Sequence, residues 1–170
     1  MERVNPMSDN LSVAQAFMTF ARSQLLEDFF PKILQCTELL TEEDLWWRPN
    51  LESNSVGNLM LHLSGNVRQW IVHGLGGEED FRDRPSEFRE QGPIPKAQLL
   101  AQLEDTLNDA ARVLDKFDLT QILEPRKIQG FDVTGLTAVF HVVEHFSQHL
   151  GQISYITKMR KAVDLQYYDL

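Results

Sequence analysis

Four stretches of the sequence carry apolar residues at the three- and four-residue spacing of a helix that buries one face. They cover about residues 13–40, 55–73, 96–117 and 134–158. The third is the most regular, and its apolar positions are Leu99, Leu100, Leu103, Leu107, Ala110, Ala111 and Leu114. Each apolar face has to be covered by another helix. The pattern therefore predicts an all-α fold, a four-helix bundle built as a single domain over residues 1–170.

The segment between the second and third helices constrains their relative direction. Residues 74–95 are polar and contain several glycines and prolines, so they are expected to form a long crossover. Short loops join antiparallel neighbours, whereas about twenty residues can carry the chain back along a whole helix. We therefore expect the second and third helices to run in the same direction. The segment 118–133 contains short β-like fragments around Gly130, which predict at most a minor hairpin.

Local signals refine the helix boundaries. Pro31 lacks a backbone N–H and crowds the preceding turn, so a kink or break is expected near residues 29–30. Thr41 and Asp44 have the spacing of a capping pair for a short helical turn. Ser55 is the expected N-cap of the second helix.

Composition and charge exclude several classes of function. The chain has 16 Lys and Arg against 25 Asp and Glu, a net charge of −9, with no basic cluster to bind a phosphate backbone. No stretch approaches the roughly 18 apolar residues of a membrane helix. Cys36 is the only cysteine, which favours a reducing compartment. We expect a cytoplasmic protein that binds neither nucleic acid nor membrane.

Histidines recur every four residues on the fourth predicted helix. His141, His145 and His149 lie on one stripe that borders the core face. Two imidazoles one turn apart can chelate one divalent ion. All three cannot, because eight residues of helix rise about 12 Å. The spacing leaves open which neighbouring pair binds, and His62 on the second helix is the obvious supplier of a third ligand.

Two other metal motifs compete with this interpretation. Residues 141–145 fit H-x-x-E-H, the signature of inverted zinc proteases, but no glutamate follows Glu144 to supply their downstream carboxylate ligand. A di-iron bundle needs a glutamate three residues before a histidine, and no histidine of this chain has one. Both alternatives are therefore disfavoured.

Three segments together resemble the DinB/YfiT-like superfamily of metal-dependent hydrolases. They are Trp46–Pro49 (WWRP), Ser53–Asn66 (SNSVGNLMLHLSGN) and His145–Ile153 (HFSQHLGQI). The resemblance covers about residues 17–156. It implies a four-helix bundle in up-down-down-up order, which agrees with the long crossover. It also implies that His62, His145 and His149 hold one divalent metal ion, with zinc and nickel both associated with the fold.

Several polar residues are expected around that ion. Asn58 and Asn66 lie one turn before and after His62, and Gln152 lies one turn beyond His149. They are candidates to hydrogen-bond a substrate or to orient the imidazoles from behind. Asn58 also suits a role at the helix start. His141 is the candidate substrate-facing base, with a boundary histidine as the alternative.

Members of the superfamily include thiol-dependent transferases and isomerases. The resemblance therefore implies a metal-dependent hydrolase or thiol-dependent transferase that acts on a small molecule. A low-molecular-weight thiol is a candidate co-substrate, and a homodimer is a candidate assembly. The alternative is a non-catalytic metal-binding stress or sensor protein of the same fold.

Overall fold

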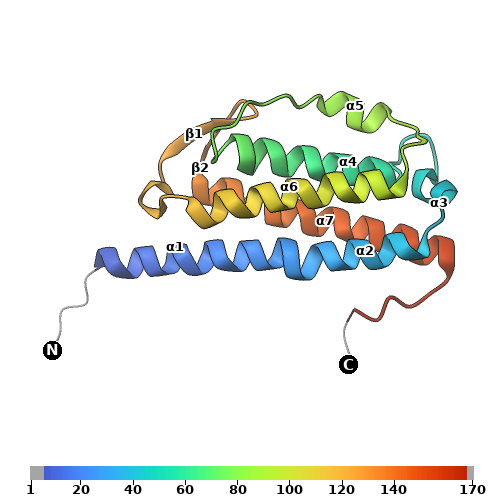
Figure 1. The fold of residues 1–170 in the computed structure, drawn as a ribbon, viewed down its shortest axis with the longest axis horizontal. Coiled ribbons are helices and arrows are strands. Elements are labelled where there is room, and N and C mark those ends of the chain that lie inside the picture. Colours follow the sequence, from blue (N-terminus) through green and yellow to red (C-terminus); the bar gives the residue numbers. More distant parts are fainter. Residues whose placement is uncertain (1–5, 168–170) are drawn as a thin grey trace.

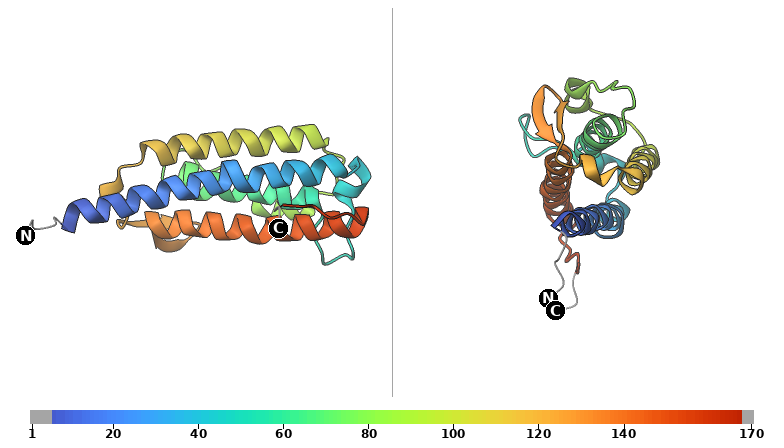
Figure 2. Two further views of the ribbon diagram at one scale, coloured as in Figure 1. Left: turned by 90° about the horizontal axis from the view of Figure 1, so that it is seen from below. Right: turned by 90° about the vertical axis from the view of Figure 1, so that its left-hand side faces the viewer.

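The computed structural model describes residues 6–167, with side chains from residue 10 onward. The predicted domain also includes residues 1–5 and 168–170, which lie outside the described residues. The chain is mostly helical, with one small hairpin (Figure 1). Long helical segments pack side by side around a common core, as the end-on view in Figure 2 shows.

The first long segment is continuous through the expected break. It consists of α1 (Pro6–Ser23), the π-helix η1 (Gln24–Phe29) and α2 (Phe30–Leu39). Pro31 lies in the first turn of α2, where a missing N–H costs least. The wider π turn directly before it carries the change in hydrogen-bond pattern, with Phe30 N donating to the Leu25 carbonyl. The expected break is therefore a π segment within one helical rod.

The next two helices begin with the predicted caps. In α3 (Glu42–Trp46), the Thr41 and Asp44 side chains each accept from the other's backbone N–H. In α4 (Val56–Val67), Ser55 and Asn58 form the same reciprocal arrangement. The helix α4 continues as the π-helix η2 (Arg68–His73). The second cap fixes the start of α4, which carries His62.

The long crossover follows η2 and contains a short helix that sequence patterns did not predict. This helix, α5 (Arg84–Arg89), lies over α4, and the chain then enters α6 (Lys96–Lys116). Figure 1 shows that α4 and α6 run in the same direction, opposite to α1 and α2. The crossover thus runs back along α4, as its length predicted.

A hairpin closes one end of the structure. After η3 (Leu119–Gln121), strand β1 (Pro125–Ile128) pairs antiparallel with β2 (Phe131–Thr134). The last helix, α7 (Gly135–Lys161), starts directly after β2 with Thr134 as its N-cap. It runs in the same direction as α1 and α2 (Figure 1).

The core lies between the long helices and is apolar. Its contributions from α7 are Ala138, Val139, Val142, Phe146, Leu150, Ile153 and Ile156. The predicted apolar stripes extended further than this core: Val13, Phe20 and Phe140 are 69%, 61% and 57% exposed. The half-buried His145 and His149 border the buried stripe of α7.

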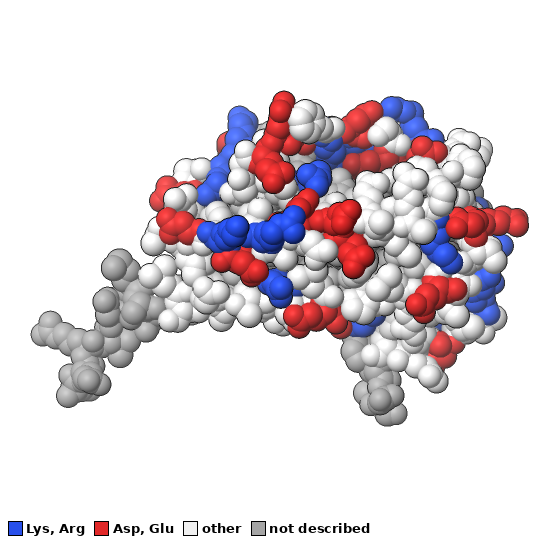
Figure 3. All heavy atoms as spheres, viewed as in Figure 1, with Lys and Arg blue, Asp and Glu red and all other residues white. Residues whose placement is uncertain are grey.

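The surface carries both signs of charge. Basic and acidic side chains are intermixed on the face shown in Figure 3. No helix among residues 6–167 is long and apolar enough to span a bilayer. That nucleic acid is not a partner stays a prediction from the net charge.

Asp44 ties the short helix α3 to the end of α7. Its side chain is 6% exposed, and its carboxylate accepts from Arg160 Nε at 2.7 Å and pairs with Lys161. Burial alone would raise the pKa of Asp44, but hydrogen bonds from Lys161, Thr41 and Arg160 outweigh it and hold the pKa well below the ordinary 3.8. The ionised carboxylate therefore stabilises the folded state.

We expect Asp44→Asn to lower the free energy of unfolding at pH 7 by about 2 kcal/mol, because it weakens hydrogen bonds to a buried charge. Since the folded pKa is depressed, the carboxylate's contribution is full above the unfolded pKa and is lost as pH falls toward the folded pKa. The gap between wild type and variant should therefore shrink below about pH 4. Urea unfolding at pH 7 and pH 3 measures it, with Glu43→Gln on the exposed face of α3 as the control. A gap that stays constant with pH would contradict this assignment.

Candidate metal centre

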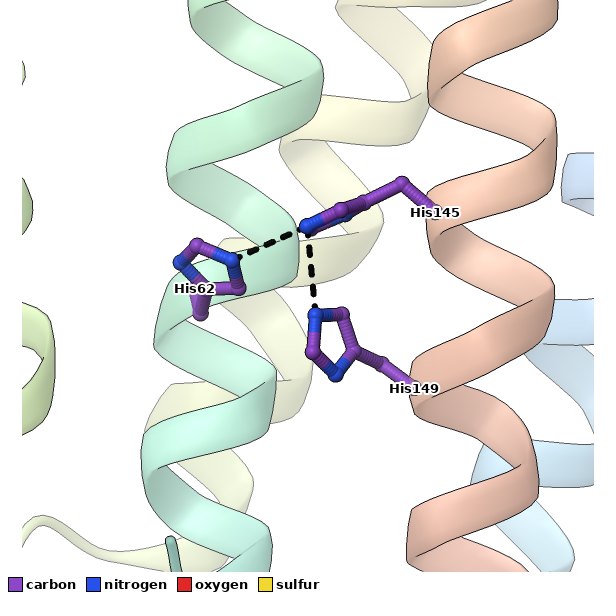
Figure 4. A group of neighbouring side chains, drawn as sticks. All are labelled: His62, His145 and His149. Carbon is purple, nitrogen blue, oxygen red and sulfur yellow. Dashed lines mark hydrogen bonds between the residues drawn. The ribbon is translucent and has the colours of Figure 1, made fainter.

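Three imidazoles from two helices converge between α4 and α7. His62 Nε2 lies 3.0 Å from His145 Nε2, which lies 3.1 Å from His149 Nε2 (Figure 4). One nitrogen of each ring lies within 4.8 Å of the other two. The candidate ligand group found among residues 6–167 consists of these three histidines, with no carboxylate or cysteine in it. We call His62, His145 and His149 the histidine triad.

The two helices place the rings by simple geometry. His145 and His149 are one turn apart on α7, so both face α4. His62 lies at the middle of α4, held in register by the cap at Ser55. Of the two pairs that spacing allowed, the structure brings the 145/149 pair to His62.

The hydrogen-bond partners of the rings indicate that the triad suits a cation. His62 Nδ1 lies 2.7 Å from the Glu87 carboxylate, and His149 Nδ1 lies 2.7 Å from the Gln152 side-chain carbonyl. Both contacts need the proton on Nδ1, which leaves lone pairs on the two Nε2 atoms. Arg82 Nη2 also lies 3.1 Å from His62 Nδ1, but it donates to Glu87 Oε2 at 3.0 Å, and the shorter carboxylate contact assigns the proton to Nδ1. His145 Nε2 carries at most one proton, so it can donate to His62 Nε2 or to His149 Nε2 but not to both. The other Nε2 would then face His145 without a hydrogen bond, whereas a cation could accept a lone pair from all three Nε2 atoms.

The surroundings keep His145 and His149 neutral, as metal ligands must be. Burial lowers the pKa of His145 to about 3, with further lowering by His149 and His62. Burial also lowers the pKa of His149, against the opposing hydrogen bond to Gln152. At neutral pH these two rings therefore offer lone pairs. The residues present fit a divalent ion.

Comparison with known proteins places the chain in a family. The sequence profile described as "Protein of unknown function (DUF1572)" matches residues 12–169. The chain belongs to this family. No curated protein matches it.

Solved structures with a similar fold have little sequence in common with this chain. A crystal structure of a DinB-like protein from Bacillus cereus aligns with a TM-score of 0.63 and 15% identity, over 86% of this chain and 90% of that chain. A conserved protein from Enterococcus faecalis aligns with a TM-score of 0.59 and 15% identity, over 87% and 95% of the two chains. The predicted DinB-like fold is confirmed.

Sequence patterns missed two residues behind the triad, Arg82 and Glu87. Both come from the crossover, which was interpreted only as a connection. Glu87 accepts from His62 Nδ1 through Oε2 and from Arg82 Nε through Oε1, at 2.7 Å each. Burial would raise the pKa of Glu87, but the hydrogen bonds from His62 and Arg82 outweigh it and lower the pKa. Glu87 is therefore a carboxylate at neutral pH.

Asn58 supports the crossover, and its hydrogen-bonding capacity is used within the protein. It is fully buried, and its Oδ1 accepts from Ser55 and from Arg48 Nη2. Its Nδ2 donates to the carbonyls of Glu87 and Glu90 at 2.8 Å each. The side chain thus combines the helix-start role with an indirect link to His62 through Glu87.

His141 lies one turn from the triad and outside it. Its ring centroid is 5.3 Å from that of His145 and 4.1 Å from that of Trp70. Asn66 is 3% exposed, and its Nδ2 donates to His141 Nε2 at 3.2 Å. Burial lowers the pKa of His141, against the opposing charge of Glu144. The ring is therefore neutral at pH 7, with Nε2 as a hydrogen-bond acceptor.

A cavity of about 560 Å³ lies between α4, α7 and the loop that precedes α4. Leu59 and Gln152 line it, and each is one helical turn from a triad histidine. The loop between α3 and α4 forms another wall, with Pro49 and Asn54 among its residues. The cavity offers room for a small molecule one helical turn from His62 and His149, but neither a triad histidine nor His141 lines it.

Proposed function

We propose that this protein is a metal-dependent enzyme, a hydrolase or a thiol-dependent transferase, which acts on a small molecule. A four-helix bundle in up-down-down-up order would form its single domain. His62, His145 and His149 would hold one divalent ion, with zinc or nickel as the candidates. The observation that carries the proposal is the convergence of three imidazoles whose Nε2 atoms cannot all be satisfied by hydrogen bonds to one another.

The donor set favours a catalytic site over a structural one. Structural zinc sites usually have four protein ligands, whereas catalytic sites have three and leave a position for another group. A divalent ion in such a site supplies Lewis acidity, which activates water or a thiol. Gln152 fixes the tautomer of His149 and also lines the cavity, so the chain can hold a substrate next to the triad.

Two measurements test the proposed function. Elemental analysis of protein purified without a His tag should find one divalent ion per chain. The metal-loaded protein should then turn over members of a panel of esters, amides and thiol conjugates, and a chelator should stop the turnover. Metal binding without turnover across the panel would favour the non-catalytic sensor or stress protein. Protein that binds neither zinc nor nickel would contradict the proposal altogether.

His141 is the proposed general base. Its neutral ring carries its lone pair on Nε2, which accepts from Asn66, so a substrate has to displace this hydrogen bond before Nε2 can take a proton. The ring lies beside that of His145, with centroids 5.3 Å apart. We expect His141→Ala to retain the metal and to lower kcat/KM by about 10²–10⁴-fold, the usual effect of losing a general base. Kinetics on the substrate found in the panel, with metal analysis of the same preparation, measures this. His73→Ala is the control, since His73 lies outside the triad and bonds the Glu78 carbonyl. Loss of metal from His141→Ala would contradict the assignment.

A further inference from the structure

We propose that the Glu87–Arg82 pair of the crossover positions the His62 side chain. The pair fixes the orientation and tautomer of the one metal ligand that α4 supplies. The inference rests on the proposed metal site. It concerns residues outside the triad, none of which would contact the ion.

The contacts of the pair are directional and buried. The side chains of Arg82 and Glu87 are 4% and 9% exposed. The Arg82 guanidinium binds both carboxylate oxygens, with Nε on Oε1 at 2.7 Å and Nη2 on Oε2 at 3.0 Å. The carboxylate is thereby held in one plane, with Oε2 directed at His62 Nδ1. Such two-point pairing fixes direction as well as distance.

Arg82 is itself held from two sides. Its Nη1 donates to Gln69 Oε1 at 2.9 Å, and Gln69 Nε2 donates to Asp80 at 2.7 Å. Asp80 also accepts from the Arg82 backbone N–H at 3.1 Å. The chain of contacts therefore runs from η2 through the crossover to His62. It leaves Glu87 little freedom to turn away.

The surface of α4 is shaped to admit the pair. A Cβ atom at Gly65 would lie 2.1 Å from Glu87 Oε1 and 2.8 Å from Arg82 Nε. Gly65 lies inside a helix, where glycine is unfavourable compared with alanine. Its place three residues after His62 therefore has a physical reason: only glycine lets the pair lie against α4 behind the ring.

His62 has particular need of such a device. His145 and His149 are neighbours on one helix, so α7 alone sets their mutual geometry. His62 is a lone ligand on another helix, and its Nε2 must present a lone pair to the ion. An acceptor on Nδ1 enforces that tautomer, and outer partners of this type typically change metal affinity 10–100-fold. Because Arg82 balances the charge of Glu87, the expected contribution is orientation rather than added negative charge.

The tautomer of His62 can be measured without any metal. The ¹⁵N chemical shifts of the His62 ring should show the proton on Nδ1 in the wild-type apo protein. Glu87→Ala and Gly65→Ala should move the proton partly to Nε2, because each removes or displaces the acceptor. A wild-type ring with its proton on Nε2 would overturn the proposal, as would unchanged shifts in both variants.

Zinc affinity supplies the second readout. In competition with a chelating dye, Glu87→Ala and Gly65→Ala should weaken Zn²⁺ binding by about 10–100-fold. Glu87→Gln, which keeps one acceptor oxygen, should retain more affinity than Glu87→Ala. The matched control is Gly151→Ala on α7, where an added Cβ meets nothing within 4 Å and should leave affinity unchanged. Equal affinity in all four variants would overturn the proposal.

The two readouts separate this inference from the proposed function. If wild-type protein binds no metal, the proposed function fails, while the ¹⁵N shifts still decide whether Glu87 sets the tautomer. If wild type binds zinc and the variants bind it equally well, the positioning role fails and the metal site remains. Gly65→Ala keeps every charged group, so it gives the answer even where Glu87→Ala fails to fold.

Discussion

His62→Ala, His145→Ala and His149→Ala should each weaken zinc binding by well over 100-fold, more than the 10–100-fold effect of an outer partner. Each substitution removes one of only three nitrogen donors in the group. The loss should be largest for His145, because its Nε2 lies between the other two, at 3.0 and 3.1 Å. His62→Ala leaves only the pair on α7, which still chelates weakly. Competition titration and elemental analysis of each variant measure the effect.

Two histidine variants serve as controls for this prediction. His73→Ala and His141→Ala should keep one ion per chain, since neither residue belongs to the triad. Full metal content after His62→Ala would contradict the site as described. Loss of the ion from His141→Ala, with the ion retained by His149→Ala, would also contradict it.

Helical periodicity predicted the long helices because each of them buries an apolar stripe. It worked best for α6, where Leu99, Leu103 and Leu107 are all 0–1% exposed. It overestimated the core on α1 and α7, where Phe20 and Phe140 are 61% and 57% exposed. Spacing shows that a residue lies on a helix face, but the width of the covered face depends on the neighbouring helix.

The histidine pattern predicted a divalent-metal site but left open which histidines form it. Spacing on α7 limited the ligands to one neighbouring pair, and the family resemblance selected His145 and His149. The structure brings this pair to His62, while His141 lies one turn away beside Trp70. Whether the triad binds an ion stays a prediction.

The contribution of the crossover could not be predicted from local patterns. Glu87 contacts a histidine 25 positions earlier in the chain, and no periodicity links a loop carboxylate to a helix. One signal was present: Gly65 lies inside a helix near His62, where glycine costs about 1 kcal/mol relative to alanine and so calls for a packing reason. The π turns were equally hidden, since local sequence around Pro31 indicated a break without its form.

Removal of the metal should leave the protein folded but less stable to heat. Phe146 and Leu150 of α7 belong to the apolar core, together with buried residues of the other long helices. Phe146 is 0% exposed and stacks on Phe29 with ring centroids 5.9 Å apart. This apolar core does not depend on an ion, so the apo protein should keep its helical circular dichroism at 25 °C.

Addition of zinc should then raise the melting temperature by mass action. A ligand that binds only the folded state at 1,000 times its Kd adds about 4 kcal/mol to the free energy of unfolding. For a chain of this size that corresponds to about 8–16 °C. Calorimetry of apo protein with and without zinc measures the shift, and His145→Ala should show almost none. An apo protein unfolded at 25 °C would make the ion structural and count against the proposed enzyme, because a catalytic ion is added to a fold that already exists.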